Sequence, residues 1–146
     1  MVSRLDRRVG YEKSGGIALF VHDSLVARLV HVSDSGQSER SWHVFHTDIG
    51  PILFGLWYRP PGYGEIQKMI GLETELKAWA PCVIGSVIIG DMNVHHKPWL
   101  QHSNGIAPEG IALFRMCSRN SIEQLIKHLL EISIYWIWFF LTLVSY

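Results

Sequence analysis

An aspartate and an asparagine, Asp91 and Asn93, stand two positions apart directly after an apolar run. Residues 87–89 (Val-Ile-Ile) predict a buried strand, and Gly90 would let the backbone come close to a ligand. Because side chains alternate along a strand, the carboxylate and the amide are expected on one face and Met92 on the other. Such oxygen atoms suit Mg²⁺ and a phosphate, so the pair predicts phosphodiester hydrolysis. The alternative is a strand end whose Asp and Asn only start a turn.

A phenol stands at the end of a second predicted strand. Residues 52–58 form this strand, and the prolines at 60–61 end it because proline lacks the N–H that a sheet needs. Tyr58 is positioned to donate a hydrogen bond to a phosphate oxygen, which offsets charge that develops in a transition state. Its alternative is a half-buried aromatic with a wet hydroxyl. Arg59 and Trp99 are candidate DNA contacts, by phosphate pairing and base stacking, and either could equally be surface packing.

The histidines and cysteines do not predict a metal site. His95 and His96 are adjacent, so on an extended segment they point in opposite directions, and no third ligand stands at a helical spacing. We expect them to pack within their loop. Cys82 and Cys117 have no paired or zinc-type spacing, and we expect both to be buried free thiols in a reducing compartment.

Length and charge restrict the class of protein. The chain has 146 residues, of which 48% are hydrophobic, enough for one domain with an apolar core. Its 13 basic and 13 acidic residues cancel, so any contact with nucleic acid must be local. Residues 1–10 carry charges with no long apolar block behind them, unlike a secretory signal. We therefore expect an intracellular protein, nuclear or cytoplasmic.

The apolar spacing predicts an α/β layered sandwich, because an antiparallel start is followed by strands that alternate with two helices. In the helix at 65–79, Glu73 and Glu75 are expected on the wetter side. The predicted elements are strands at 16–22 and 25–32, a polar loop at 33–40, strands at about 42–48, at 52–58 and up to residue 89, helices at 65–79 and 109–120, and a last strand at 122–126.

Three segments occur in the order found in one known family. They are Gly-Gly-Ile-Ala-Leu-Phe-Val at 15–21, Leu-Trp-Tyr-Arg-Pro-Pro at 56–61, and Gly-Asp-Met-Asn-Val-His-His-Lys-Pro-Trp at 90–99. Together they resemble the endonuclease domain of non-LTR retrotransposons, a member of the endonuclease/exonuclease/phosphatase superfamily. The resemblance covers roughly residues 12–128.

This resemblance implies a partial four-layer α/β/β/α sandwich and an endonuclease that uses Mg²⁺ to nick DNA for reverse transcription. DNA is then the partner, with no obligate protein partner and no membrane. Asp91 matches the aspartate that orients the attacking water, Asn93 matches the asparagine that binds a phosphate oxygen, and Tyr58 matches the tyrosine of a Tyr-x-Pro segment. Met92 replaces the usual aromatic residue, which we expect to affect packing rather than chemistry.

The alternative function is a catalytically inactive fragment without an enzymatic role. In the family, a metal-binding glutamate precedes the segment that matches 15–21, and a late aspartate and an Asp-His pair follow the segment that matches 90–99. Glu12 lies too close to Gly15 to be that glutamate, and no aspartate follows Asp91 in this chain. The metal ligand is therefore unknown.

The tail at 129–146 is predicted to be non-native. When the codons of residues 134–140 are shifted by two nucleotides, they must encode Ile or Leu, Leu, Asp, Leu or Met, Val, then Phe or Leu. This matches the Leu-Asp-Leu-Val-Leu strand of the family and indicates a frameshift near His128. The rival interpretation is a membrane anchor at 132–146, but these 15 residues are fewer than the about 20 that a spanning helix needs.

Sequencing the locus and its transcript tests the frameshift hypothesis. We expect either a gene-model error or a decayed copy of the element, with the Leu-Asp-Leu-Val-Leu sequence present in the shifted frame. An uninterrupted frame through the present tail in both DNA and transcript would refute it.

Overall fold

The protein is described by a computed structural model and has an α/β fold with two sheets. One sheet has two strands in the order β1-β2, and the other has six strands in the order β3-β4-β5-β6-β8-β7. The α/β class predicted from the sequence is confirmed. The structure describes residues 3–9, 12–32, 39–61, 66–100, 103–125 and 138–143.

Most of the larger sheet is antiparallel, with one parallel pair at its centre. β3, β4 and β5 form an antiparallel meander, β5 and β6 run parallel, and β8 runs antiparallel to both β6 and β7. The parallel pair needs a crossover, which the helix α1 supplies. The elements are β1 (Ser3–Val9), β2 (Glu12–Leu19), β3 (Val26–Val32), β4 (Glu39–Thr47), β5 (Gly50–Tyr58), α1 (Ile66–Trp79), the 3₁₀ turn η1 (Ala80–Cys82), β6 (Gly85–Asp91), α2 (Pro108–Arg119), β7 (Glu123–Gln124) and β8 (Trp138–Leu143).

The predicted strands and helices are present, but some of their bounds differ. The strand expected at 16–22 is β2, which starts at Glu12 because its first residues pair with β1. The polar loop expected at 33–40 is too long, since Glu39 and Arg40 already pair with β5; residues 33–38 lie outside the described part of the chain. The last predicted strand, at 122–126, is reduced to β7, and residue 126 also lies outside the described residues.

The predicted non-native tail contributes one strand to the sheet. β8 lies between β6 and β7, with Gly85 to Gly90 of β6 opposite Leu143 to Trp138. The remaining residues of 129–146 lie outside the described chain, so the non-native origin of the tail stays a prediction. Within the described residues, no helix is long and apolar enough to cross a membrane.

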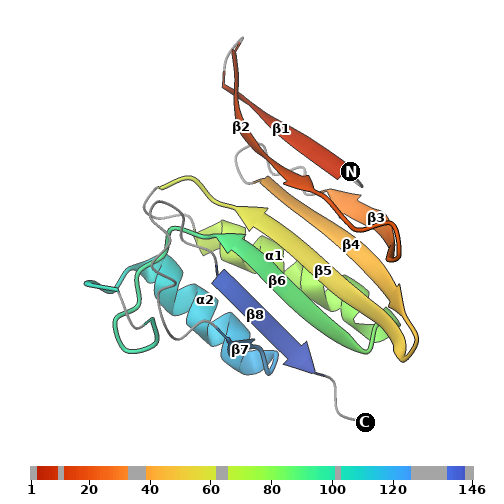
Figure 1. The fold of residues 1–146 in the computed structure, drawn as a ribbon. Coiled ribbons are helices and arrows are strands. Elements are labelled where there is room, and N and C mark those ends of the chain that lie inside the picture. The colour runs from red at the N-terminus through yellow and green to blue at the C-terminus, as the bar shows by residue number, and fades with distance from the viewer. Residues whose placement is uncertain are drawn as a thin grey trace.

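The two helices cover one face of the larger sheet, and the β1-β2 hairpin projects beyond the sheet with one end near β4 and β5 (Figure 1). β2 contacts both β4 and β5, which are interior strands, so the hairpin must approach from the face that the helices leave open. The main core fills the space between helices and sheet. Its most deeply buried members are Trp42, Leu53, Trp57, Met69, Leu72, Ile88, Met92, Leu100, Leu113 and Met116.

The side chain of Glu75 binds α1 to strand β4 of the larger sheet. Glu75 accepts two hydrogen bonds from Arg40, at 2.6 and 2.7 Å, and a third at 2.7 Å from the indole N–H of Trp42. The guanidinium of Arg40 also lies 5.1 Å from the ring centre of Trp57. The expectation that Glu75 lies on the wetter side is therefore wrong, because it is the anion that pairs with a buried arginine of β4.

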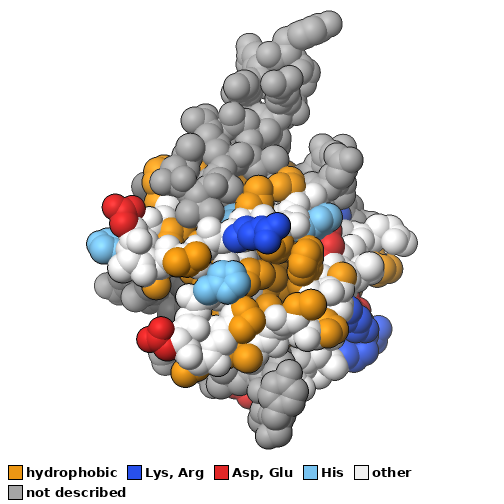
Figure 2. All heavy atoms as spheres, turned by 90° about the vertical axis from the view of Figure 1, so that its right-hand side faces the viewer, with side chains coloured by type: hydrophobic (Ala, Val, Ile, Leu, Met, Phe, Trp, Pro, Cys, Tyr) orange, Lys and Arg blue, Asp and Glu red, His pale blue; other side chains and the backbone are white. Residues whose placement is uncertain are grey.

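The edge strand β3 exposes apolar side chains beside polar ones. Val26 and Leu29 are exposed, and Arg28 lies between them. Figure 2 views the molecule from this side and shows hydrophobic side chains next to basic and histidine side chains. The register of β3 against β4 also shifts between Leu29 and His31. A charge and an irregular register both hinder edge-to-edge pairing with another chain.

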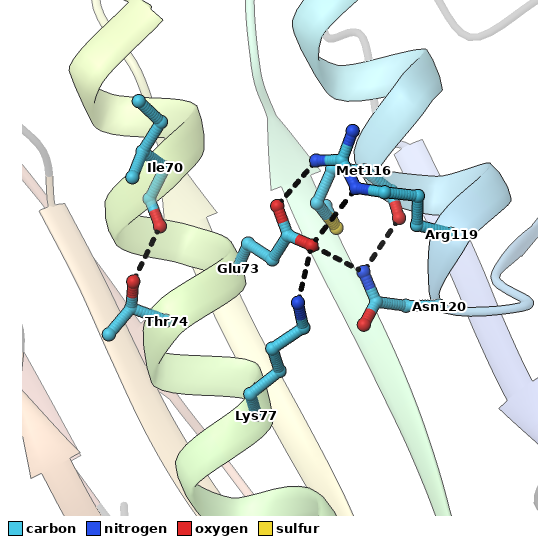
Figure 3. A network of polar contacts seen from close by, with 7 residues as sticks. All are labelled: Ile70, Glu73, Thr74, Lys77, Met116, Arg119 and Asn120. Atoms are coloured by element: carbon cyan, nitrogen blue, oxygen red, sulfur yellow. Dashed lines mark hydrogen bonds and ion pairs between the residues drawn. The ribbon is translucent and has the colours of Figure 1, made fainter.

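The two helices are joined to each other by a network around Glu73 (Figure 3). Its carboxylate accepts hydrogen bonds from Arg119 at 2.6 Å and from Asn120 at 3.1 Å, and forms an ion pair with Lys77 at 2.9 Å. The hydrogen bond from Arg119 is the main reason that the pKa of Glu73 falls to about 2, with a second contribution from Lys77. The prediction that Glu73 lies on the wetter side of the helix is also wrong, because its carboxylate binds side chains of α2.

We predict that Glu73→Gln weakens the helix pair in a pH-dependent way. A carboxylate whose pKa is lowered by folding stabilises the native state above its ordinary pKa of 4.5, and this contribution disappears as the pH falls towards about 2. Since Arg119 and Lys77 are 56% and 60% exposed, the loss near pH 7 should be only about 0.5–1 kcal/mol. Urea denaturation near pH 7 and near pH 2.5 measures it.

The exposed carboxylate of Glu123 on β7 provides a control. Glu123→Gln should cost less at neutral pH than Glu73→Gln. A Glu73→Gln deficit that stays the same size at both pH values would show that the carboxylate charge does not stabilise the helix pair.

Candidate functional site

The parallel pairing of β5 with β6 brings two of the predicted site residues together. Tyr58, the last residue of β5, is the register neighbour of Asp91, the last residue of β6. The preceding residue Trp57 is buried in the core against the helices, so by strand alternation Tyr58 lies on the opposite face. Both Tyr58 and Asp91 are partly exposed. The site is thus open to solvent at the carboxyl end of two parallel strands.

Asn93 lies beside Asp91 because the chain turns there. The strand ends at Asp91, and Asn93 has a positive φ of 44°, which asparagine tolerates better than most residues. The backbone N–H of Asn93 donates to Oδ1 of Asp91 at 3.2 Å. A carboxylate that accepts a hydrogen bond from the N–H two residues later is typical of an aspartate that starts a turn. This is the geometry expected under the alternative interpretation, in which Asp91 and Asn93 only start a turn. The two side chains are therefore brought together by this turn rather than by strand alternation.

The pKa of the Asp91 carboxyl is raised. Burial is the main cause, because it disfavours the charged form, while hydrogen bonds from the backbone and side chain of Asn93 act in the opposite direction. A carboxyl with a perturbed pKa at the open end of a sheet is typical of functional sites, although structural carboxyls show such shifts too.

Arg59 does not contact solvent, so the prediction that it contacts DNA is wrong for this structure. Its side chain is fully buried, and its guanidinium donates to the carbonyl oxygens of Met92 at 3.1 Å and Asn93 at 2.8 Å. It also lies 3.6 Å from the carboxylate of Glu109, which is equally buried. Arg59 therefore holds the loop after β6 instead of a phosphate.

Trp99 belongs to an aromatic cluster between this loop and α2. Its ring centre lies 6.1 Å from that of His96 and 5.4 Å from that of Phe114, and the His96 and Phe114 rings stack at 4.8 Å. Trp99 is partly exposed, so base stacking by it stays a prediction. The opposite directions expected for the histidines are confirmed, since His95 is exposed and His96 is buried.

The two cysteines lie in different environments. Cys117 is buried in the core, as predicted, and burial raises the pKa of its thiol to about 12. Cys82 is exposed, so the prediction that it is buried is wrong. Cys82 closes η1, the turn that connects α1 to β6, and a turn lies at the surface.

Two functional candidates escaped the sequence analysis. Glu39 of β4 is the register neighbour of Tyr58 on the side away from Asp91, and it is buried. Glu109, in the first turn of α2, is the buried partner of Arg59. An acidic residue in the first turn of a helix is common for electrostatic reasons alone, so nothing in the sequence marked Glu109 as buried.

The described part of the chain contains no group of three or more His, Cys, Asp or Glu residues that could hold a metal ion. No protein-family model, curated protein or solved structure matches the chain.

Gly90 has a structural role that differs from the predicted one. A Cβ atom at this position would overlap the backbone carbonyl of Trp57 on the neighbouring strand. The close approach that glycine permits here is thus to β5, and not to a ligand as the sequence suggested. Because the obstacle is backbone, a side chain at position 90 must push the two site-bearing strands apart.

We predict that Gly90→Ala destabilises the fold by at least about 3 kcal/mol. Gly105→Ala is the matched control, since a Cβ atom there meets nothing within 4 Å and the change should cost no more than about 0.5 kcal/mol. Urea denaturation of both variants and the wild type measures the difference. Equal stability of the two variants would mean that β5 and β6 are not packed as closely as described.

Proposed function

We propose that this chain is part of a metal-dependent phosphodiesterase, a DNA endonuclease domain of a retrotransposon that nicks target DNA for reverse transcription. The observation that carries the proposal is the juxtaposition of Tyr58 and Asp91 at the ends of two parallel strands, with Asn93 bound to Asp91. A phenol, a carboxylate and an amide then converge at one solvent-exposed sheet end. The family resemblance of the three sequence segments supports the same class of reaction.

In this proposal each side chain has one task. The Asp91 carboxylate accepts a hydrogen bond from the attacking water and orients it towards phosphorus. The Tyr58 hydroxyl donates to a phosphate oxygen, where charge develops in the transition state. The Asn93 amide would bind a second phosphate oxygen with the N–H that it directs at the Asp91 carboxylate in the free protein, while its other N–H stays on the Arg59 carbonyl.

The site residues leave the protein ligand of Mg²⁺ unassigned, because Asp91 orients the attacking water and the described part of the chain holds no cluster of metal-binding side chains. Mg²⁺ in nucleases is commonly held by one or two carboxylates, with waters and substrate phosphates as the other ligands. When bound, the ion would neutralise phosphate charge and lower the pKa of a water ligand.

The layer order supports the finer fold assignment, which we also propose: a partial four-layer α/β/β/α sandwich of the endonuclease/exonuclease/phosphatase type. The helices form one outer layer and the six-stranded sheet forms the next. The β1-β2 hairpin then belongs to a second β layer, because it contacts β4 and β5 on the face away from the helices.

A plasmid assay tests the proposed function. Purified protein is incubated with supercoiled plasmid and Mg²⁺, with EDTA in a parallel reaction, and open-circle DNA is measured over time. We expect nicking that EDTA abolishes and that Asp91→Asn lowers by about 100-fold or more. Tyr58→Phe, which removes one hydrogen-bond donor to developing charge, should lower it by about 100-fold.

Asp48→Asn is the control, because Asp48 is an exposed carboxylate in the turn at the other end of the β4-β5 hairpin. This variant should nick as the wild type does. A folded wild-type chain that does not nick would favour the alternative, a catalytically inactive fragment. Nicking that survives Asp91→Asn would indicate a contaminating nuclease.

A further inference from the structure

Arg59 binds the loop after β6 with its backbone as well as its side chain. Its N–H donates to the carbonyl of Asp91 at 2.8 Å, and its carbonyl accepts from the side-chain amide of Asn93 at 2.8 Å. Its guanidinium donates to the carbonyls of Met92 and Asn93. One residue therefore makes four hydrogen bonds to three consecutive residues, and two of these bonds fix Asn93 itself.

The N-terminal end of α2 closes the other side of this loop. Glu109 lies in the first turn of α2 and pairs with Arg59, while Ala107 donates its N–H to the carbonyl of His95 at 2.8 Å. A Cβ atom on Gly110 would overlap the same His95 carbonyl, so helix and loop are in close contact. The segment that carries Asn93 is thus held between the end of β5 and the start of α2.

We propose that Arg59 and Glu109 are a buried pair of positioning residues that holds Asn93 against the Asp91 carboxylate. This inference rests on the proposed function for the catalytic use of Asn93, but the geometry it describes is independent of activity. The pair touches no substrate. It acts through Asn93, which has a left-handed backbone. The Asn93 carbonyl accepts a hydrogen bond from the Arg59 guanidinium, and the Asn93 side-chain amide donates one to the Arg59 carbonyl.

A purely structural pair and a positioning pair respond differently to substitution. Removing one partner of a buried ion pair is destabilising, whereas replacing both with apolar residues of similar size often restores stability. An apolar pair cannot donate hydrogen bonds to the carbonyls of Met92 and Asn93. The double variant Arg59→Met/Glu109→Met therefore separates fold stability from the position of Asn93.

The experiment follows the titration of the Asp91 carboxyl by ¹³C NMR, together with the rate of plasmid nicking. Hydrogen bonds from Asn93 lower the pKa of Asp91, so their loss should move its titration to higher pH. In the described part of the sheet, the ionisable residues beside Asp91 are Tyr58 on β5 and, beyond it, Glu39 on β4. None of the variants changes them. We expect Arg59→Lys and the double variant to shift the Asp91 titration upwards. We also expect kcat for nicking to fall by about 100-fold with KM little changed.

The ion pair between Arg119 and Glu73 supplies the matched control, because it joins α1 to α2 away from the site. Arg119→Lys should change neither the Asp91 titration nor kcat. A stable double variant with a wild-type Asp91 titration would overturn the proposal and leave the pair a structural one. If the wild type does not nick, the proposed function fails, while the titration still decides whether the pair positions Asn93.

Discussion

The parallel pairing of β5 with β6 is the constraint on which the candidate site depends. Parallel strands end at the same edge of a sheet, so the residues that leave both strands become neighbours. Tyr58 and Asp91 meet for this reason alone. The two strands approach each other closely at this point, because a Cβ atom at Gly90 would overlap the backbone carbonyl of Trp57. The positions of Tyr58 and Asp91 are therefore set by the sheet, whereas Asn93 is placed by the turn that follows β6.

Two arginine-carboxylate pairs with buried arginines connect the helices to the rest of the fold, and a third pair, Arg119 with Glu73, joins the helices to each other. Arg40 pairs with Glu75 to hold α1 on β4, and Arg59 pairs with Glu109 to hold α2 at the end of β5. Arginines used in this way are unavailable to a polyanion. In a chain with no net charge, the proposed binding of DNA would then depend on exposed cations such as Lys97.

The alternating and helical patterns predicted most elements correctly, but they did not predict the register of the β4-β5 hairpin. The strands predicted at about 42–48 and at 52–58 leave residues 49–51 for the turn. The actual turn is the two-residue loop at 48–49, and Gly50, with a positive φ of 139°, already begins β5. When the residues of β4 and β5 are counted outwards from this turn, Glu39 pairs with Tyr58. One misplaced turn thus concealed a neighbour of the site.

The buried charges show a second limit of sequence patterns. Arg59 and Glu109 lie 50 positions apart in the chain, and patterns of apolar spacing assign charged residues to the surface. Each can be buried only because the other compensates its charge, so neither burial follows from a local rule. The turn at Asp91 and Asn93 was predicted as an alternative to a functional site, yet the structure makes the two compatible. The turn that follows β6 places the Asn93 amide beside the Asp91 carboxylate. The buried pair of Arg59 and Glu109 then holds Asn93 in this position.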